Sequence, residues 1–135
     1  MVVFGYNAGS GYVDAGEQRK LAASSLHRFP VSSVRGHPQA AACEALACLP
    51  SHLARVLVHF DVDVIDGDEF AAADLPHRGG LALREAMEAL RVFVQTPRFA
   101  GLVVTEFNPV RDPDLVFARR LVAGLADSFR GAPWA

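Results

Sequence analysis

Residues 55–66 read RVLVHFDVDVID, and this stretch decides the expected fold. An apolar β-forming run leads directly into three aspartates, Asp61, Asp63 and Asp66. Side chains two apart on a strand point the same way, so we expect Asp61 and Asp63 on one face, with His59 one step behind. In open parallel sheets, ligands bind at the carboxyl ends of the strands. Paired carboxylates there predict a site for a hard cation, Mg²⁺ or Mn²⁺.

The rest of the chain alternates between strand-like and helix-like patterns. This alternation predicts an α/β fold of three layers, α/β/α, with a parallel sheet, and residues 1–135 as a single domain. Residues 66–80 form a long loop without clear periodicity, and loops of that length are often functional. We predict strands at residues 2–6, 29–34, 55–64 and 99–107, helices at 16–26, 38–49, 83–94 and from Asp112 as N-cap, and a turn at 7–12.

Composition restricts the class of protein and its partners. A chain of 135 residues with 51% hydrophobic residues is long enough to bury a core. The net charge of -2 and the lack of a basic block argue against nucleic acid and anionic membranes as partners. No apolar run approaches the length of a membrane span, and we expect a cytoplasmic location. Cys43 and Cys48 fit neither a redox pair nor a zinc motif, and we expect both to be buried in a helix.

Three motifs occur in order along the second half of the chain. They are HFDVDVID at residues 59–66, PHRGGL at 76–81 and TEFNP at 105–109. This combination and its spacing resemble the arginase, agmatinase and formiminoglutamase family of ureohydrolases. The resemblance covers nearly the whole chain and is strongest over residues 55–127. It implies an arginase-type fold, represented by its carboxyl-terminal half and incomplete at the amino end.

The resemblance also implies a chemistry and roles for individual residues. Asp61 and Asp63 match carboxylates that help to hold two Mn²⁺ ions. Asp66 matches a structural aspartate that does not bind the metal itself but helps to position the residues that do. Glu106 matches the residue that pairs with the cationic group of the substrate. The implied reaction is hydrolysis of a linear guanidino or amidine C–N bond by a metal-activated hydroxide. The implied partner is therefore a small cationic guanidino or amidine compound.

The sequence departs from the family pattern in several ways. The upstream GGDH and DAHxD motifs, which carry further metal ligands, do not occur in residues 1–135, so no complete catalytic set is present. We therefore expect a truncated or degenerate member, with a bare strand edge at residues 2–6. Gly67 stands where the family has proline, and Leu75 where threonine is common. His59 matches no family ligand and is expected to be packed or hydrogen-bonded, while His77 lies in the loop that could approach substrate.

Two other classes of function fit parts of the pattern. An apolar strand followed by DxD also resembles a haloacid-dehalogenase-type phosphatase, but that chemistry needs a downstream lysine. The single lysine, Lys20, precedes the motif. A DxD motif of a nucleotide-sugar transferase has no other support. The remaining alternative is a non-catalytic remnant that serves as a packing or oligomerisation module, including a homo-oligomer.

Overall fold

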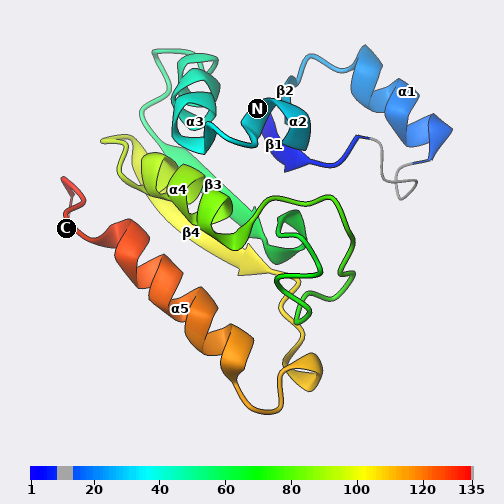
Figure 1. Ribbon diagram of the computed structural model, residues 1–135. Helices are drawn as coiled ribbons and strands as arrows, with labels where there is room; N and C mark the ends of the chain where they lie inside the picture. The colour runs from blue at the N-terminus through cyan, green and yellow to red at the C-terminus, as the bar shows by residue number, and fades with distance from the viewer. Residues whose placement is uncertain (9–13, 135) are drawn as a thin grey trace.

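The computed structural model describes residues 1–8 and 14–134, and Figure 1 shows how its helices flank two short parallel sheets. The turn predicted at residues 7–12 falls largely outside the described residues. None of the described helices is long and apolar enough to cross a membrane. In chain order the elements are β1 (Val2–Tyr6), α1 (Ala15–Ala23), β2 (His27–Pro30), α2 (Val31–Val34), α3 (Pro38–Ala47), β3 (Val56–Asp61), η1 (Val62–Val64), α4 (Leu83–Val94), β4 (Phe99–Thr105), η2 (Pro109–Arg111) and α5 (Val116–Phe129).

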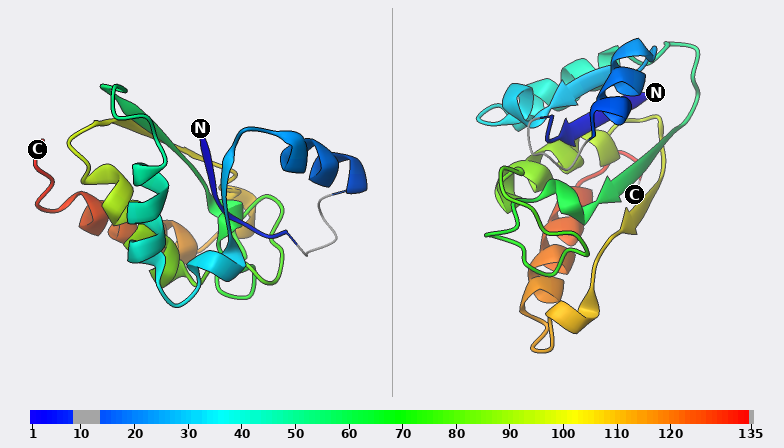
Figure 2. Two further views of the ribbon diagram at one scale, coloured as in Figure 1. Left: turned by 90° about the horizontal axis from the view of Figure 1, so that it is seen from above. Right: turned by 90° about the vertical axis from the view of Figure 1, so that its right-hand side faces the viewer.

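The strands pair in parallel, as the alternation of elements predicts. β1 pairs with β2 and β3 pairs with β4, each pair forming a sheet of two strands. Helices α4 and α5 lie on one side of the β3–β4 sheet, as the right-hand view of Figure 2 shows. The described residues leave the opposite side of this sheet without a helix. The predicted α/β class is confirmed, with one layer of helices over β3 and β4.

The core continues past β3 into the segment that carries the aspartates. Val62, Ile65 and Phe70 follow the strand directly and are fully buried, as is Leu81 at the end of the loop. The loop of residues 66–80 is therefore anchored by apolar side chains at both ends. Backbone bonds between Leu81 and Val64 and between Asp66 and Leu81, at 2.9 and 2.8 Å, fix the anchor. A well-packed base of this kind holds the polar groups above it in one arrangement.

Three predicted elements differ clearly from the structure. The strand predicted at residues 55–64 ends at Asp61, and Val62–Val64 form the 3₁₀ turn η1. The predicted strand at residues 29–34 is wrong, because β2 ends at Pro30 and α2 follows. Pro30 cannot donate to a sheet ladder, and a helical turn buries both Val31 and Val34. The last helix starts at Val116 instead of following Asp112 directly. The Asp112 carboxylate still accepts hydrogen bonds from the N–H groups at positions 117 and 118, at 3.1 and 2.7 Å.

The cysteines do not have the predicted environment. Helix α3 buries Ala41, Ala42 and Ala45, as its apolar spacing predicts. Cys43 lies on the other side of this helix and is exposed, and Cys48 is half-buried. Both are free thiols. The expectation that both cysteines are buried is therefore wrong, because a run rich in small apolar residues does not show which side faces the core.

Candidate functional site

Asp61 and Asp63 lie at the carboxyl end of β3, but not on one face of a strand. The strand ends at Asp61, and Asp63 belongs to the 3₁₀ turn that follows. The Asp63 N–H donates to Asp61 Oδ1 at 2.9 Å, and the Leu75 N–H donates to Asp63 Oδ1 at 3.3 Å. The prediction that strand periodicity places them together is wrong. A capped turn brings them together instead.

Two carboxylates at this end of the sheet, Asp63 and Glu106, have raised pKa values. Burial raises the pKa of Asp63, the hydrogen bond from Leu75 opposes that shift, and the charges of Asp61 and Asp74 add to it. The pKa of Glu106 is also raised, first by desolvation and then by the charges of Asp61, Asp63 and Asp74. Like charges that disfavour one another's ionisation favour a bound cation. The site is therefore electrostatically suited to a positively charged ligand.

The end of β4 holds this cluster together through its backbone. Glu106 has a φ of 63°, a left-handed conformation that is uncommon for glutamate and is often found at functional sites. The Asp74 N–H donates to the Glu106 carbonyl at 2.7 Å, and Asn108 Nδ2 donates to Asp74 Oδ1 at 2.8 Å. Sequence reasoning missed Asp74 and Asn108 as site residues. Asn108 lies in the quoted TEFNP motif, which is the signal that could have identified it.

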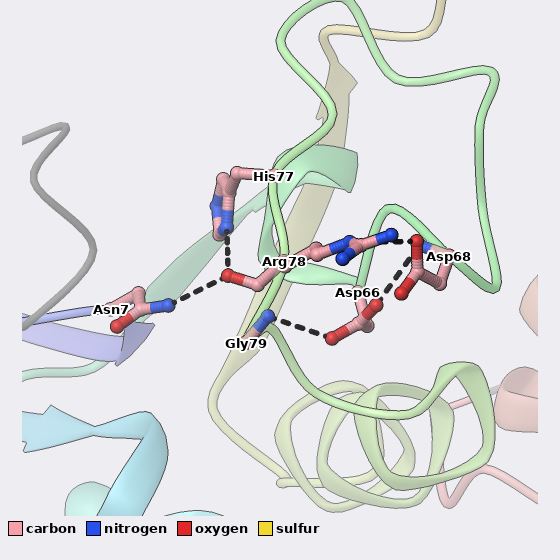
Figure 3. A network of polar contacts seen from close by, with 6 residues as sticks. All are labelled: Asn7, Asp66, Asp68, His77, Arg78 and Gly79. Carbon is pink, nitrogen blue, oxygen red and sulfur yellow. Dashed lines mark hydrogen bonds and ion pairs between the residues drawn. The ribbon is translucent and has the colours of Figure 1, made fainter.

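Asp66 is turned toward the backbone of the loop (Figure 3). Its carboxylate accepts hydrogen bonds from the N–H groups of Asp68 and Gly79, at 2.9 and 2.8 Å. The bond from Asp68 is the main reason that the pKa of Asp66 is lowered, and the bond from Gly79 adds to the effect despite partial burial. Arg78 pairs with Asp68 at 3.2 Å, and its carbonyl accepts from Asn7 Nδ2 at 3.1 Å. Asp66 therefore stabilises the loop beside the carboxylate cluster.

The two candidate histidines lie in different settings. His59 is exposed on β3, and its Nε2 lies 2.8 Å from the Oγ1 of Thr105 on β4. His77 is half-buried in the loop. It borders a cavity of about 550 Å³ together with Asp61, Asp63 and residues of β1, and His59 lines the same cavity. His77 therefore lies on the same cavity as the two aspartates.

The described residues carry the donor type of a hard-cation site but no complete set of ligands. Asp61 and Asp63 provide carboxylate oxygens, the donor type that Mn²⁺ and Mg²⁺ take in proteins. Within residues 1–8 and 14–134, however, no three His, Cys, Asp or Glu side chains are placed to hold a metal ion together. The donor chemistry fits Mn²⁺, whereas the number of donors does not complete a site.

Comparison with known proteins assigns the family. The family model described as "Arginase family" matches residues 3–129, so the chain belongs to the arginase family. The arginase of Eremothecium gossypii is 39% identical over 66 residues, which are 48% of this chain and 16% of that protein. The resemblance read from the three motifs is therefore confirmed.

Solved structures confirm the arginase-type fold. The arginase of Bacillus cereus superposes on 96% of this chain with a TM-score of 0.81 and 24% identity, and this chain covers 44% of it. The formiminoglutamase of Trypanosoma cruzi, solved with Mn²⁺, superposes on 98% of this chain with a TM-score of 0.79 and 20% identity, again with 44% of its own length covered. The chain thus spans less than half the length of these relatives.

Proposed function

We propose that this chain carries part of the binuclear Mn²⁺ site of a ureohydrolase-like enzyme that hydrolyses a linear guanidino or amidine C–N bond. The observation that supports this function best is the cluster of carboxylates at the carboxyl ends of β3 and β4, where the charges of Asp61 and Asp74 contribute to the raised pKa values of Asp63 and Glu106. Membership of the arginase family and the Mn²⁺ in the solved formiminoglutamase support the choice of metal. The same membership sets aside the phosphatase interpretation.

The proposal gives each residue a task. Asp61 and Asp63 would hold the metal through their carboxylate oxygens, and Mn²⁺, when bound, would lower the pKa of a water molecule so that it could act as a nucleophile near neutral pH. Glu106, held at the end of β4 in its left-handed conformation, pairs with the cationic group of the substrate. Asp66 keeps the loop in place, and His77 lies where the loop borders the cavity. His59 is assigned no step, because its ring already lies against Thr105.

A non-catalytic packing or oligomerisation module is the second candidate function. It is favoured by one observation, that the described residues contain no complete metal-binding set. In this alternative, the chain keeps the carboxylates of the family but binds no metal. The cytoplasmic location, a homo-oligomer and the lack of nucleic-acid or membrane partners stay predictions.

Calorimetric titration of the purified chain with Mn²⁺ separates the two candidates. We expect binding by the wild type and its loss in both Asp61→Asn and Asp63→Asn, which remove charge but keep the side-chain size. Asp114→Asn is the matched control, since Asp114 is an exposed carboxylate in the turn before α5. Equal binding by all four proteins would place the metal elsewhere. A complete lack of binding would favour the non-catalytic module.

Activity is then measured with arginine, agmatine and formiminoglutamate as substrates. We expect little turnover from residues 1–135 alone, because two carboxylates do not complete the metal site. Any turnover should require Mn²⁺ and should fall in Asp61→Asn. Glu106→Gln should raise KM more than it lowers kcat, because it removes the charge that pairs with the cationic substrate. A Glu106→Gln variant with an unchanged KM would contradict this role.

A further inference from the structure

The cavity of about 550 Å³ that borders the candidate site has two walls, and we call it the carboxylate cavity. Residues 1–7 line it on one side, and Asp61, Asp63 and His77 are among the residues that line it on the other. In the part of the chain that the structure describes, β1 pairs with β2 and β3 pairs with β4, so no shared sheet joins the two walls. Their relative placement therefore depends on contacts made outside the sheets.

The end of β1 lies directly against the base of the loop of residues 66–80. A Cβ at Gly5 would lie only 2.5 Å from Cγ2 of Val64. A Cβ at Gly79 would lie 2.7 Å from Nδ2 of Asn7, so a larger residue at either glycine would push the two walls apart. Asn7 Nδ2 also donates to the Arg78 carbonyl at 3.1 Å (Figure 3). The opening of the carboxylate cavity is therefore closely tied to the place of the end of the loop.

The turn after α2 holds the end of the loop through hydrogen bonds. Arg35 directly follows α2, and its Nη2 donates to the Gly80 carbonyl at 2.8 Å and to the Gly79 carbonyl at 3.3 Å. The next residue, Gly36, donates its N–H to Oε1 of Glu85 in α4 at 2.6 Å. Helix α2 in turn packs on β1 and β2. The turn therefore connects the wall that contains β1 with the end of the loop and the start of α4.

Arg35 is connected through the loop to the aspartates of the other wall. Gly79 is held on two sides, because its carbonyl accepts from Arg35 while its N–H donates to Asp66 Oδ2 at 2.8 Å. The pKa of Asp66 is lowered mainly by its backbone hydrogen bonds, and the positive charge of Arg35 lowers it further. The same loop supplies the Leu75 N–H that donates to Asp63. A change at Arg35 therefore reaches both aspartates through the backbone of the loop.

We propose that Arg35 is a positioning residue, whose guanidinium holds the end of the loop in one place relative to β1 and so sets the opening of the carboxylate cavity. A guanidinium suits this task because it stays charged at any pH and carries several N–H donors in one plane. The link from the cavity to substrate or metal rests on the proposed function. The holding of the loop does not, and a protein that binds no Mn²⁺ would still show it.

NMR of the metal-free protein tests the holding of the loop. Arg35→Met removes the charge and the donors but keeps an unbranched side chain. We expect the Gly79 and Leu75 amides to exchange hydrogen about fivefold faster, the effect of roughly one hydrogen bond. Nuclear Overhauser effects between Gly5 and the methyl groups of Val64 should weaken, because they report how closely β1 approaches the loop. The other hydrogen bonds between the two walls remain, so the amides of β3 should exchange as in the wild type.

Two further variants and a pH titration separate positioning from general stabilisation. Arg35→Lys restores a positive charge with N–H donors, and it should bring the exchange rates part of the way back to those of the wild type. Arg84→Met is the matched control, because Arg84 is an exposed arginine that pairs with Glu88 of its own helix, and it should change none of these rates. In a carboxyl NMR titration, the pKa of Asp66 should rise in Arg35→Met and fall again in Arg35→Lys.

The proposal is overturned if the loop amides of Arg35→Met exchange as in the wild type, or if the pKa of Asp66 does not move. Equal acceleration at the β3 amides would also overturn it, because Arg35 would then stabilise the whole fold. Calorimetric titration with Mn²⁺ tests the proposed function separately. A wild type that binds Mn²⁺ should bind it about fivefold more tightly than Arg35→Met does, and equal affinity would contradict an effect on the cavity. A wild type that binds none would refute the metal site, and the NMR results would still decide the role of Arg35.

Discussion

Gly80 is the position at which a single added methyl group should disturb the loop beside the site. An ideal Cβ at Gly80 would lie 2.6 Å from the Asp66 nitrogen, 2.7 Å from the Ile65 carbonyl carbon and 2.8 Å from the Val64 oxygen. Real Cβ atoms almost never approach within 3.0 Å, and all three neighbours are backbone atoms that cannot rotate away. In Gly80→Ala, the loop must therefore move away from the end of β3. This movement strains the hydrogen bonds that Leu81 makes with Val64 and Asp66.

The expected cost follows from these contacts. Overpacking against a rigid environment costs about 1–3 kcal/mol, and each weakened hydrogen bond adds up to about 1 kcal/mol. We expect Gly80→Ala to lower the free energy of unfolding by about 2–4 kcal/mol, out of a total of about 5–15 kcal/mol for a domain. Urea unfolding followed by circular dichroism measures this difference.

The matched control is Gly101→Ala in β4. A Cβ at Gly101 would meet only the end of the Leu57 side chain, at 3.4 Å, and Leu57 is largely exposed. We expect Gly101→Ala to change the free energy of unfolding by less than about 0.5 kcal/mol. If Gly80→Ala proves as stable as the wild type, the loop is not packed against β3 as described, and the reasoning fails.

Two further predictions concern the core and the loop. Phe70 is fully buried, and its ring packs against Phe107 and Phe117. Phe70→Ala should therefore lower the free energy of unfolding by about 3–5 kcal/mol. In the control Val122→Ala, the side chain removed is 63% exposed, and we expect a loss of less than about 0.5 kcal/mol. Similar unfolding midpoints for the two variants would contradict the assigned core. The pKa of Asp66 is lowered in the folded state, mainly by the hydrogen bond from the Asp68 N–H, so its ionised form stabilises the fold above the unfolded value near 3.8. The difference in free energy of unfolding between wild type and Asp66→Asn should therefore be largest at neutral pH and shrink as the pH falls through the pKa of Asp66 in the folded state. A difference that stays constant from pH 7 to 2 would show that Asp66 does not act through its charge.

The sequence alone was sufficient to predict the class of fold and the family. The apolar run before Asp61 and the helical spacing of residues 83–94 are local patterns. The helix forms at the predicted residues, whereas the strand predicted at residues 55–64 ends at Asp61. The three motifs identify the arginase family because they combine residue types with fixed spacing, which periodicity alone cannot do. The structure also places Glu106 next to the aspartates, as expected for the ends of neighbouring parallel strands.

The tertiary structure alone decided which groups meet. Asp74 joins the cluster because Asn108, 34 residues away, bonds to its carboxylate, and no local pattern encodes that distance. Asp63 reaches Asp61 through a capped turn, since a hydrogen bond to the backbone replaces the next step of the strand. The placement of β1 and β3 in two separate sheets is likewise visible only in the tertiary structure. Residue order specifies each strand and helix, whereas the contacts between distant elements determine the candidate site.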